Sequence, residues 1–199
     1  EVILCGGTYN SPHLLQISGI GAGAHLKDIG VEVRHELPGV GANLADHFGA
    51  KIKHRVRGEM TMNQLSRFPY VVPEIAKYAL FGNGALTFGV TSAIVFCRSR
   101  EGLASPDLQL SFTPATPKDE SQGALEKEPG ATVTAIPVRA ESRGTVMAKS
   151  ADPYVYPAVT PSYLSDENDV NVLYSGVQIV RRIFDSPALK DISMGEFAP

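Results

Sequence analysis

The chain has 199 residues, a formal net charge of −3, 43% apolar residues and 20% charged residues. This composition excludes global disorder, and the length allows a substantial core in one or two domains. The small net charge, with no basic stripe and no RNA-binding aromatic motif, argues against a nucleic-acid partner. No apolar run approaches the roughly 20 residues that a transmembrane helix needs. Two cysteines are too few for a disulfide framework, so we expect Cys5 and Cys97 to be buried thiols.

The beginning of the chain has the pattern of a strand, a glycine turn and a short helix. Residues 1–5 are an apolar run that ends on two glycines, as a buried parallel strand does when it turns toward a ligand. Ser11 is expected to cap the helix, Pro12 suits its first position, and Gly19 suits its end. Ligands collect where such strands end, because a helix start offers N–H groups to an anion. A tight connection without a ligand is the alternative.

The next part of the chain is predicted to be short elements joined by turns. Residues 24–30 have a helical pattern ended by a glycine, and residues 31–37 alternate as a half-buried strand does. Residues 38–41 are a turn cluster of proline and glycine. Residues 43–47 are then expected to form a single helical turn.

A strand with a cationic face and a proline-started helix are predicted next. Residues 48–56 alternate with Lys51, Lys53 and Arg55 on one face, which is typical of a solvated surface, and phosphate binding is the alternative. Residues 73–81 are predicted to be a helix that a glycine ends. The aromatic residues around this helix either line an apolar pocket or, as is more usual, pack in the core. They are Phe68, Tyr70, Tyr78, Phe81 and Phe88.

The second half of the chain is predicted to supply most of a sheet and one long helix. Residues 91–97 are apolar and β-branched, which favours a central strand, and residues 107–113 alternate cleanly between apolar and polar side chains. The alternation puts Gln109 on the face opposite Leu108, but the pattern does not decide which face meets the core. Residues 131–138 and 144–149 are predicted to form a hairpin, and residues 166–184 an amphipathic helix. Its apolar stripe consists of Val170, Leu173, Val177, Val180 and Phe184.

Several stretches resemble, in order, signatures of the glucose-methanol-choline (GMC) family of flavoprotein oxidoreductases. They are residues 7–21 (GTYNSPHLLQISGIG), 25–31 (HLKDIGV), 37–47 (LPGVGANLADH), 142–146 (SRGTV) and 157–164 (PAVTPSYL), followed by Asp169. The resemblance implies an α+β fold: a mostly antiparallel sheet of about five strands with flanking helices, plus a remnant of the parallel FAD-binding layer. Residues 1–48 would be part of the FAD-binding domain, and residues 49–199 the substrate-binding domain.

The chain departs from the family pattern at both ends. It has no dinucleotide-binding Gly-x-Gly-x-x-Gly motif, and all five histidines lie in its first third, so none matches the family's catalytic histidine near the carboxyl terminus. Glu1 begins within a strand pattern, without methionine. We therefore expect an internal fragment of a longer enzyme, with the remainder of that enzyme as its partner and the catalytic base outside this chain.

The resemblance also implies site residues. Those expected beside FAD are Cys5, Gly6, Gly7, Thr8, Ser11 and Asn43. His47 and Gln109 are expected on the substrate side, where a histidine can hold an alcohol oxygen. The alternative for His47 is a polar residue satisfied within a capped turn. No metal site is expected, because the carboxylates of residues 118–130 lack ligand spacing.

The function implied by the resemblance is oxidation of the CH–OH group of a small-molecule alcohol by hydride transfer to FAD. Two alternatives remain open: a hydroxynitrile-lyase-type member of the same family, and a stand-alone binding domain without catalysis. The isolated chain is expected to show no alcohol turnover and weak or absent flavin retention. The choline dehydrogenase-like and alcohol oxidase-like branches of the family are not separated by these residues.

Overall fold

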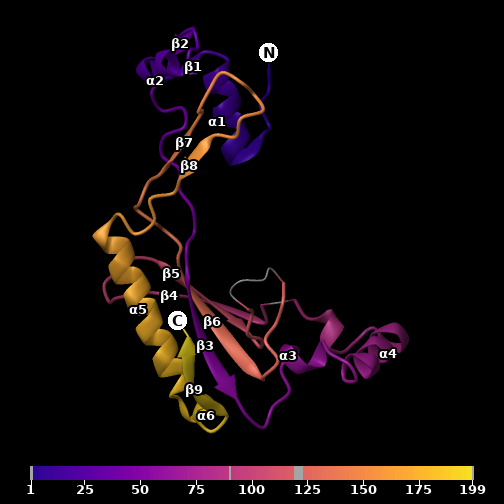
Figure 1. The fold of residues 1–199 in the computed structure, drawn as a ribbon. Coiled ribbons are helices and arrows are strands. Elements are labelled where there is room, and N and C mark those ends of the chain that lie inside the picture. The colour runs from indigo at the N-terminus through magenta and orange to yellow at the C-terminus, as the bar shows by residue number, and fades with distance from the viewer. Residues whose placement is uncertain (1, 90, 119–122, 199) are drawn as a thin grey trace. The chain divides into compact units, whose positions relative to one another are not determined.

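The computed structural model of the protein describes residues 2–89, 91–118 and 123–198 (Figure 1). Their contacts divide the chain into two compact units. Unit 1 comprises Glu1–His47 and Ala140–Val170, and unit 2 comprises Phe48–Arg139 and Asn171–Pro199. The first seam between the units lies beside the domain boundary expected at residue 48. Residues 140–170 pack with the amino-terminal segment, because their strands contact the first helix.

Unit 1 is built from short elements around two small sheets. Strand β1 (Ile20–Gly21) pairs in parallel with β2 (His35–Glu36), and β7 (Thr145–Met147) pairs antiparallel with β8 (Ala158–Thr160). Helix α1 (Gly7–Ile17) contacts β7, and helix α2 (Gly23–Asp28) follows β1. The predicted helix at 24–30 is confirmed, whereas only two residues of the strand predicted at 31–37 pair with a neighbour.

The opening of the chain differs from its predicted form. Residues 2–5 form no strand in the described structure, and the side chains of Val2 and Ile3 are largely exposed. A strand needs a neighbour for its backbone groups, and the described part of unit 1 provides none here. Helix α1 begins at Gly7, so Ser11 lies within the helix and is not its N-cap. The expectation of two buried thiols was wrong for Cys5, which is exposed.

Unit 2 is centred on one five-stranded sheet with the order β4-β5-β6-β3-β9, in which every neighbouring pair is antiparallel. The strands are β3 (Ala50–Val56), β4 (Ala93–Cys97), β5 (Leu108–Thr113), β6 (Gly130–Pro137) and β9 (Ser193–Ala198). Helix α5 (Glu167–Phe184) lies along this sheet (Figure 1). The predicted mostly antiparallel sheet with flanking helices is therefore confirmed.

The core of unit 2 lies between the sheet and α5. It contains apolar side chains from β3, β5, β6 and α5: Ile52, Val56, Leu108, Leu110, Ala131, Val133, Ala135, Val172, Val180 and Phe184. Gly176 lets α5 approach closely, because a Cβ at that position would lie 2.9 Å from both Leu108 and Ala135. Of the predicted stripe of α5, Val180 and Phe184 are buried, and Leu173 and Val177 are partly buried against the same core. Val170 was predicted incorrectly, because it is exposed and Val172 is buried in its place.

The structure corrects the predicted pairing of β4 and β7 and adds a strand, β9, that was not predicted. Strand β4 is at the sheet edge, because it pairs only with β5, and its Ile94 and Phe96 are more than half exposed. Strands β6 and β7 form no hairpin, since β7 pairs with β8 in the other unit. Strand β9 was not predicted. It pairs with β3, and two hydrogen bonds of 2.8 Å from Arg181 to Glu196 join it to α5.

The remaining helices of unit 2 lie between β3 and β4 and after α5. They are α3 (Met62–Leu65), α4 (Val71–Phe81), the 3-10 helix η1 (Ala85–Thr87) and α6 (Pro187–Lys190). Helix α4 ends at Gly82 in the left-handed conformation, as predicted for residues 73–81. Within the described ranges, none of the helices combines the length and apolar composition that a membrane span requires.

Candidate functional site

The first predicted cofactor segment lies at the start of α1. Gly7 has a φ of 72°, a conformation that favours glycine, and a Cβ placed there would meet no atom within 4 Å. No side chain caps the first turn, and the Ser11 hydroxyl accepts a 3.1 Å hydrogen bond from the Gly6 N–H. Cys5, Gly6, Gly7 and Thr8 are all exposed. The start of this eleven-residue helix therefore presents backbone N–H groups and a partial positive charge to an open space.

One buried side chain anchors α1 to the β7–β8 hairpin. The Gln16 side chain is 1% exposed, and its amide nitrogen donates to the Val146 carbonyl at 2.9 Å. Its amide oxygen accepts from the Ala148 N–H at 2.7 Å. Both polar ends of the amide are thus satisfied by the backbone of one strand, which fixes the position of the helix relative to β7.

The loop that carries Asn43 is attached to the same hairpin. The Val146 N–H donates to the Gly41 carbonyl at 2.7 Å, and Leu44 and Gly144 exchange backbone hydrogen bonds of 2.8 and 2.9 Å. Between these anchors Asn43 is exposed, with a φ of 60° in the left-handed region. The helical turn predicted for residues 43–47 was wrong, since the loop is extended where it bridges to Gly144. Unit 1 therefore attaches both predicted cofactor segments to one hairpin.

His47 follows an aspartate that is bound on both carboxylate oxygens. Asp46 Oδ1 accepts from the His47 N–H at 2.9 Å, and Asp46 Oδ2 accepts from the Tyr163 hydroxyl at 2.5 Å. The hydrogen bond to Asp46 raises the pKa of Tyr163. His47 itself is exposed. The link from Asp46 to Tyr163, which lies just beyond β8, holds the end of the loop in unit 1, and the substrate-side role of His47 stays a prediction.

Asp169 supports the hairpin from the start of α5. Its carboxylate accepts hydrogen bonds from the N–H groups of Glu141 and Ser142 at 2.8 and 2.9 Å, and its side chain is 1% exposed. Burial raises the pKa of this carboxyl, but the hydrogen bonds from Ser142 and Glu141 outweigh burial and lower the pKa overall. The role of Asp169 in the structure is therefore to hold the turn that leads into β7.

The polar face of the unit 2 sheet holds Gln109. Leu108 and Leu110 point into the core under α5, so the alternating Gln109 and Ser111 lie on the opposite face, where the Gln109 amide donates to the Ser111 hydroxyl at 2.9 Å. Ser111 pairs with Thr134, which in turn pairs with Lys51. A polar row thus crosses three strands. The structure decides the orientation that the alternation left open.

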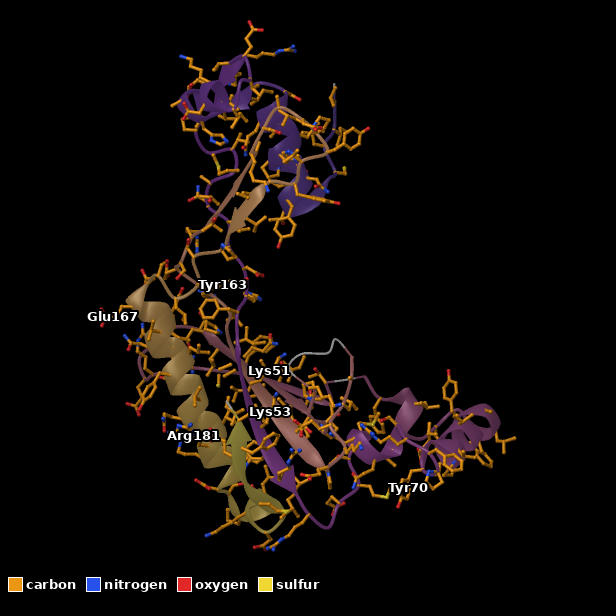
Figure 2. All side chains as sticks on the ribbon, viewed as in Figure 1. Lys51, Lys53, Tyr70, Tyr163, Glu167 and Arg181 are labelled. Atoms are coloured by element: carbon orange, nitrogen blue, oxygen red, sulfur yellow. The ribbon has the colours of Figure 1, made fainter. Side chains whose placement is uncertain are left out.

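The cationic face of β3 was expected to be exposed to solvent, and this is wrong for two of its three cations. Lys53 is 1% exposed, and its ammonium donates to the Pro117 carbonyl at 3.3 Å. Arg55 pairs with Glu126 and Glu128 and lies over the Phe197 ring. Lys51, labelled in Figure 2, is exposed. Among the described residues it takes part in no ion pair. The loop after β5 and strand β9 cover the buried Lys53 and the half-buried Arg55, which the pattern of β3 alone does not indicate.

An apolar pocket lies beside α3 and α4, as one of the two alternatives for the aromatic residues of this region proposed, and of those five residues Phe88 lines it. Its volume is about 300 Å³. Its apolar walls are formed by Met60, Met62, Leu65, Ala85, Phe88 and Pro114. The methionine walls were not predicted. The sequence signal for them was the pair Met60 and Met62 in a stretch without periodicity. The core packing expected for the nearby aromatic residues was wrong: Phe68, Tyr70, Tyr78 and Phe81 are exposed, and Phe88 lines the pocket while two thirds exposed.

The other clusters of polar side chains among the described residues are structural. No group of three or more metal-type side chains is assembled in the described ranges. His54 stacks on Phe184 with ring centroids 3.7 Å apart, and its Nδ1 lies 2.9 Å from the Ser193 hydroxyl. Burial lowers the pKa of His54, although Glu196 and Asp185 oppose the effect. This histidine stabilises the packing of β3 against α5.

Comparison with known proteins identifies the class of protein. The family profiles described as GMC oxidoreductase match residues 1–49 and 140–199, so that together they cover both parts of unit 1 and the end of unit 2. The chain belongs to the GMC oxidoreductase family. The resemblance of the motifs at 7–21, 37–47 and 142–164 is confirmed, and these motifs form the α1, Asn43 loop and β7–β8 assembly.

Curated relatives match this chain over its whole length. Fatty acid photodecarboxylase of Chlamydomonas reinhardtii is 32% identical over 217 residues, and oxygen-dependent choline dehydrogenase of Staphylococcus saprophyticus is 36% identical over 200 residues. Each alignment covers 100% of this chain, but only 36% and 35% of the respective relative. The chain therefore spans about a third of the length of the curated relatives it matches.

A solved structure shares the fold. Formate oxidase from Aspergillus oryzae, in a variant made to study FAD modification, superposes with a TM-score of 0.81 at 22% sequence identity. The match covers 96% of this chain and 38% of that protein. At this identity the likeness shows the fold alone.

Proposed function

We propose that the complete protein is a flavin-dependent oxidoreductase that oxidises the CH–OH group of an alcohol, with FAD as its cofactor. Family membership supports the reaction class, and a choline dehydrogenase is among the relatives. The observation that carries the proposal is the exposed backbone turn at Gly6 and Gly7, where α1 begins with open space beside Gly7. In this family position, an open turn with free N–H groups suits a cofactor that carries carbonyl and phosphate oxygens.

The residues of unit 1 fit this cofactor. The residues that would hold FAD are Cys5, Gly6, Gly7, Thr8, Ser11 and Asn43. The open space beside Gly7 allows close approach of a planar ring, and the first-turn N–H groups can donate to its oxygens. Gln16 and the Gly144 bridges fix these segments on one hairpin, so little conformational entropy would be lost on binding. FAD, when bound, supplies the acceptor for the hydride that leaves the carbinol carbon.

The residues of this chain would orient the alcohol and exclude water. His47 would donate an imidazole N–H to the alcohol oxygen. Gln109, on the polar face of the unit 2 sheet, is the other residue proposed on the substrate side. The general base would be supplied from outside these 199 residues. Residues 1–48 would act as part of the FAD-binding domain, and residues 49–199 as the substrate-binding domain, with residues 140–170 supporting the cofactor segments.

The proposal is tested on the complete flavoprotein by adding alcohols without oxygen and recording the flavin spectrum. We expect the oxidised flavin band to bleach, and no cyanide to be released from a cyanohydrin; cyanide release without bleaching would instead indicate a lyase. The role of the turn is tested with Gly7→Val. We expect valine to relax the turn away from the left-handed region, and restoring that conformation when FAD binds would cost about 1–2 kcal/mol, or roughly 5- to 30-fold in affinity.

The matched control for Gly7→Val is Gly39→Val, because Gly39 is also exposed and open, has no φ in the left-handed region, and is outside the predicted cofactor residues. We expect this control to retain FAD, as measured by the ratio of flavin to protein absorbance after dialysis. Full FAD retention in Gly7→Val would remove the turn from the cofactor site.

A further inference from the structure

We propose that the apolar pocket beside α3 and α4 binds the neutral, apolar tail of the substrate alcohol, so that the protein prefers alkyl or aryl alcohols to small or cationic ones. This inference rests on the proposed alcohol oxidation and adds a substrate class to it. The pocket is lined by Met60, Met62, Leu65, Ala85, Phe88 and Pro114. A cavity of about 150 Å³ holds benzene, so a space of about 300 Å³ admits a ring or an alkyl chain.

The walls of the pocket are held by a buried polar hub. The Asn63 side chain, which is fully buried, donates to Thr116 Oγ1 at 2.7 Å and accepts from the Thr116 N–H at 3.0 Å. The Thr61 N–H donates to Gln64 at 2.8 Å, and the Met62 N–H donates to the Pro114 carbonyl at 2.9 Å. Satisfied buried hydrogen bonds of this kind fix the backbone. The methionines therefore line a formed pocket and supply adaptable, polarizable surface.

The opposite wall is fixed by Glu74. Its carboxylate accepts from the Ala85 N–H at 2.7 Å and pairs with Lys77 at 2.5 Å, and these two contacts lower the pKa of Glu74. Gly84 permits this arrangement, because a Cβ there would lie 2.8 Å from a Glu74 carboxylate oxygen. The carboxylate is thus already occupied by the protein.

The charges around the pocket favour a neutral ligand over a cationic one. Among the described lining residues Glu74 is the acidic one, and its two partners leave no free negative charge for a cationic substrate. Quaternary ammonium groups are usually held by several aromatic faces, whereas Phe88 is the aromatic residue of this lining. On the polar sheet face, the exposed ammonium of Lys51 would repel a cation. These features favour a neutral tail.

The pocket adjoins the strand that carries the proposed substrate contacts. Pro114 directly follows β5, which holds Gln109 and Ser111, and the Ser92 N–H donates to the Phe112 carbonyl at 2.9 Å. Ser111 and Pro114 are three residues apart, which is about 10 Å along a strand. In this proposal the hydroxyl end of the alcohol lies at the polar row, and its tail lies beyond the end of β5, against Pro114.

The test compares straight-chain primary alcohols from ethanol to decanol on the complete flavoprotein. Burying each methylene is expected to raise kcat/KM about two- to fourfold until the pocket is filled, and choline is expected to be a poor substrate. Ala85→Leu fills the pocket and should abolish the rise of kcat/KM with chain length. Ala79→Leu is the matched control, because Ala79 is exposed on α4 and does not line the pocket.

A second variant avoids the folding risk of a buried substitution. Phe88→Ala removes an exposed wall residue and should lower the ratio of kcat/KM for decanol to kcat/KM for ethanol severalfold. Binding is measured separately by calorimetry with tertiary alcohols of the same tails, whose carbinol carbon has no hydrogen to transfer. We expect affinity to increase with tail length in the wild type and in Ala79→Leu, but not in Ala85→Leu.

The two readouts separate the pocket from the reaction. Length-dependent binding of tertiary alcohols that Ala85→Leu removes would support the pocket even if no alcohol bleached the flavin. Equal length dependence in the wild type, Ala85→Leu and Phe88→Ala would overturn the inference while leaving alcohol oxidation intact. A preference for choline over every neutral alcohol would also overturn it.

Discussion

The two units of this protein are stabilised in different ways. In unit 2 a five-stranded sheet and α5 enclose a continuous apolar core, whereas in unit 1 short segments are joined by directional hydrogen bonds to one hairpin. Apolar burial is proportional to area and tolerates changes in detail, while a buried hydrogen bond depends on each partner. The region proposed to hold FAD is therefore stabilised mainly by specific polar anchors, and the region proposed to hold the substrate by packing.

The largest expected effect breaks the packing of unit 2. Leu108→Ala removes a fully buried side chain of the core, and we expect a loss of about 2–5 kcal/mol in the free energy of unfolding. Hydrogen exchange measured by mass spectrometry should accelerate in peptides of β3, β5 and β6. Leu80→Ala is the control, because Leu80 is 74% exposed on α4. Equal destabilisation by both variants would contradict the assignment of this core.

A polar truncation tests the anchoring of unit 1. Gln16→Ala leaves the Val146 carbonyl and the Ala148 N–H without their partner, which should cost about 2 kcal/mol of local stability. Exchange should accelerate in α1 and β7 but not in the sheet of unit 2. Asn10→Ala, at an exposed position of the same helix, serves as the control. If peptides from β7 were unaffected by Gln16→Ala, the polar anchoring described for unit 1 would be wrong.

The carboxylate of Asp169 gives unit 1 a dependence on acid. The pKa of Asp169 is lower in the folded protein than in the unfolded chain, where it is about 3.9. Its contribution to the free energy of unfolding is therefore fully present above that value and is lost as the pH falls through the folded-state pKa. Asp169→Asn should cost about 1–2 kcal/mol at neutral pH, since it weakens the hydrogen bonds from Glu141 and Ser142. Urea unfolding measured at several pH values should show that the variant lacks the loss of unfolding free energy that Asp169 causes in the wild type at acid pH.

The smallest expected effect is the pH dependence of stability that His54 gives to unit 2. It falls at a higher pH than the effect of Asp169. Burial lowers the pKa of His54 on folding, so the unfolded state binds more protons as the pH falls below about 6.5, and acid favours unfolding there. Glu196 and Asp185 oppose this effect and Arg181 adds to it. His54→Gln should flatten the stability curve near this pH. An unchanged slope would contradict the neutral, stacked state of His54.

Local patterns predicted the elements that depend on local chemistry. Helix α4 ends at Gly82 because glycine readily adopts the left-handed conformation, and α5 has acidic residues in its first turn and arginines in its last. The alternation of residues 107–113 predicted β5, although the face that meets the core was decided by α5. In the candidate site, the motifs located the Gly6–Gly7 turn and the Asn43 loop, but their shared attachment to β7 came from contacts more than 100 residues apart.

From its residues alone, this protein could be placed in its family and given a mostly antiparallel sheet, because motif order and short-range periodicity are properties of the chain itself. Only the tertiary structure decided that β4 is an edge strand, that β7 pairs with β8, that Lys53 is buried and that Met60 and Met62 line a pocket. Strand partners and burial depend on which distant segments meet. An apolar run has the same local pattern whether one neighbour or two will cover it.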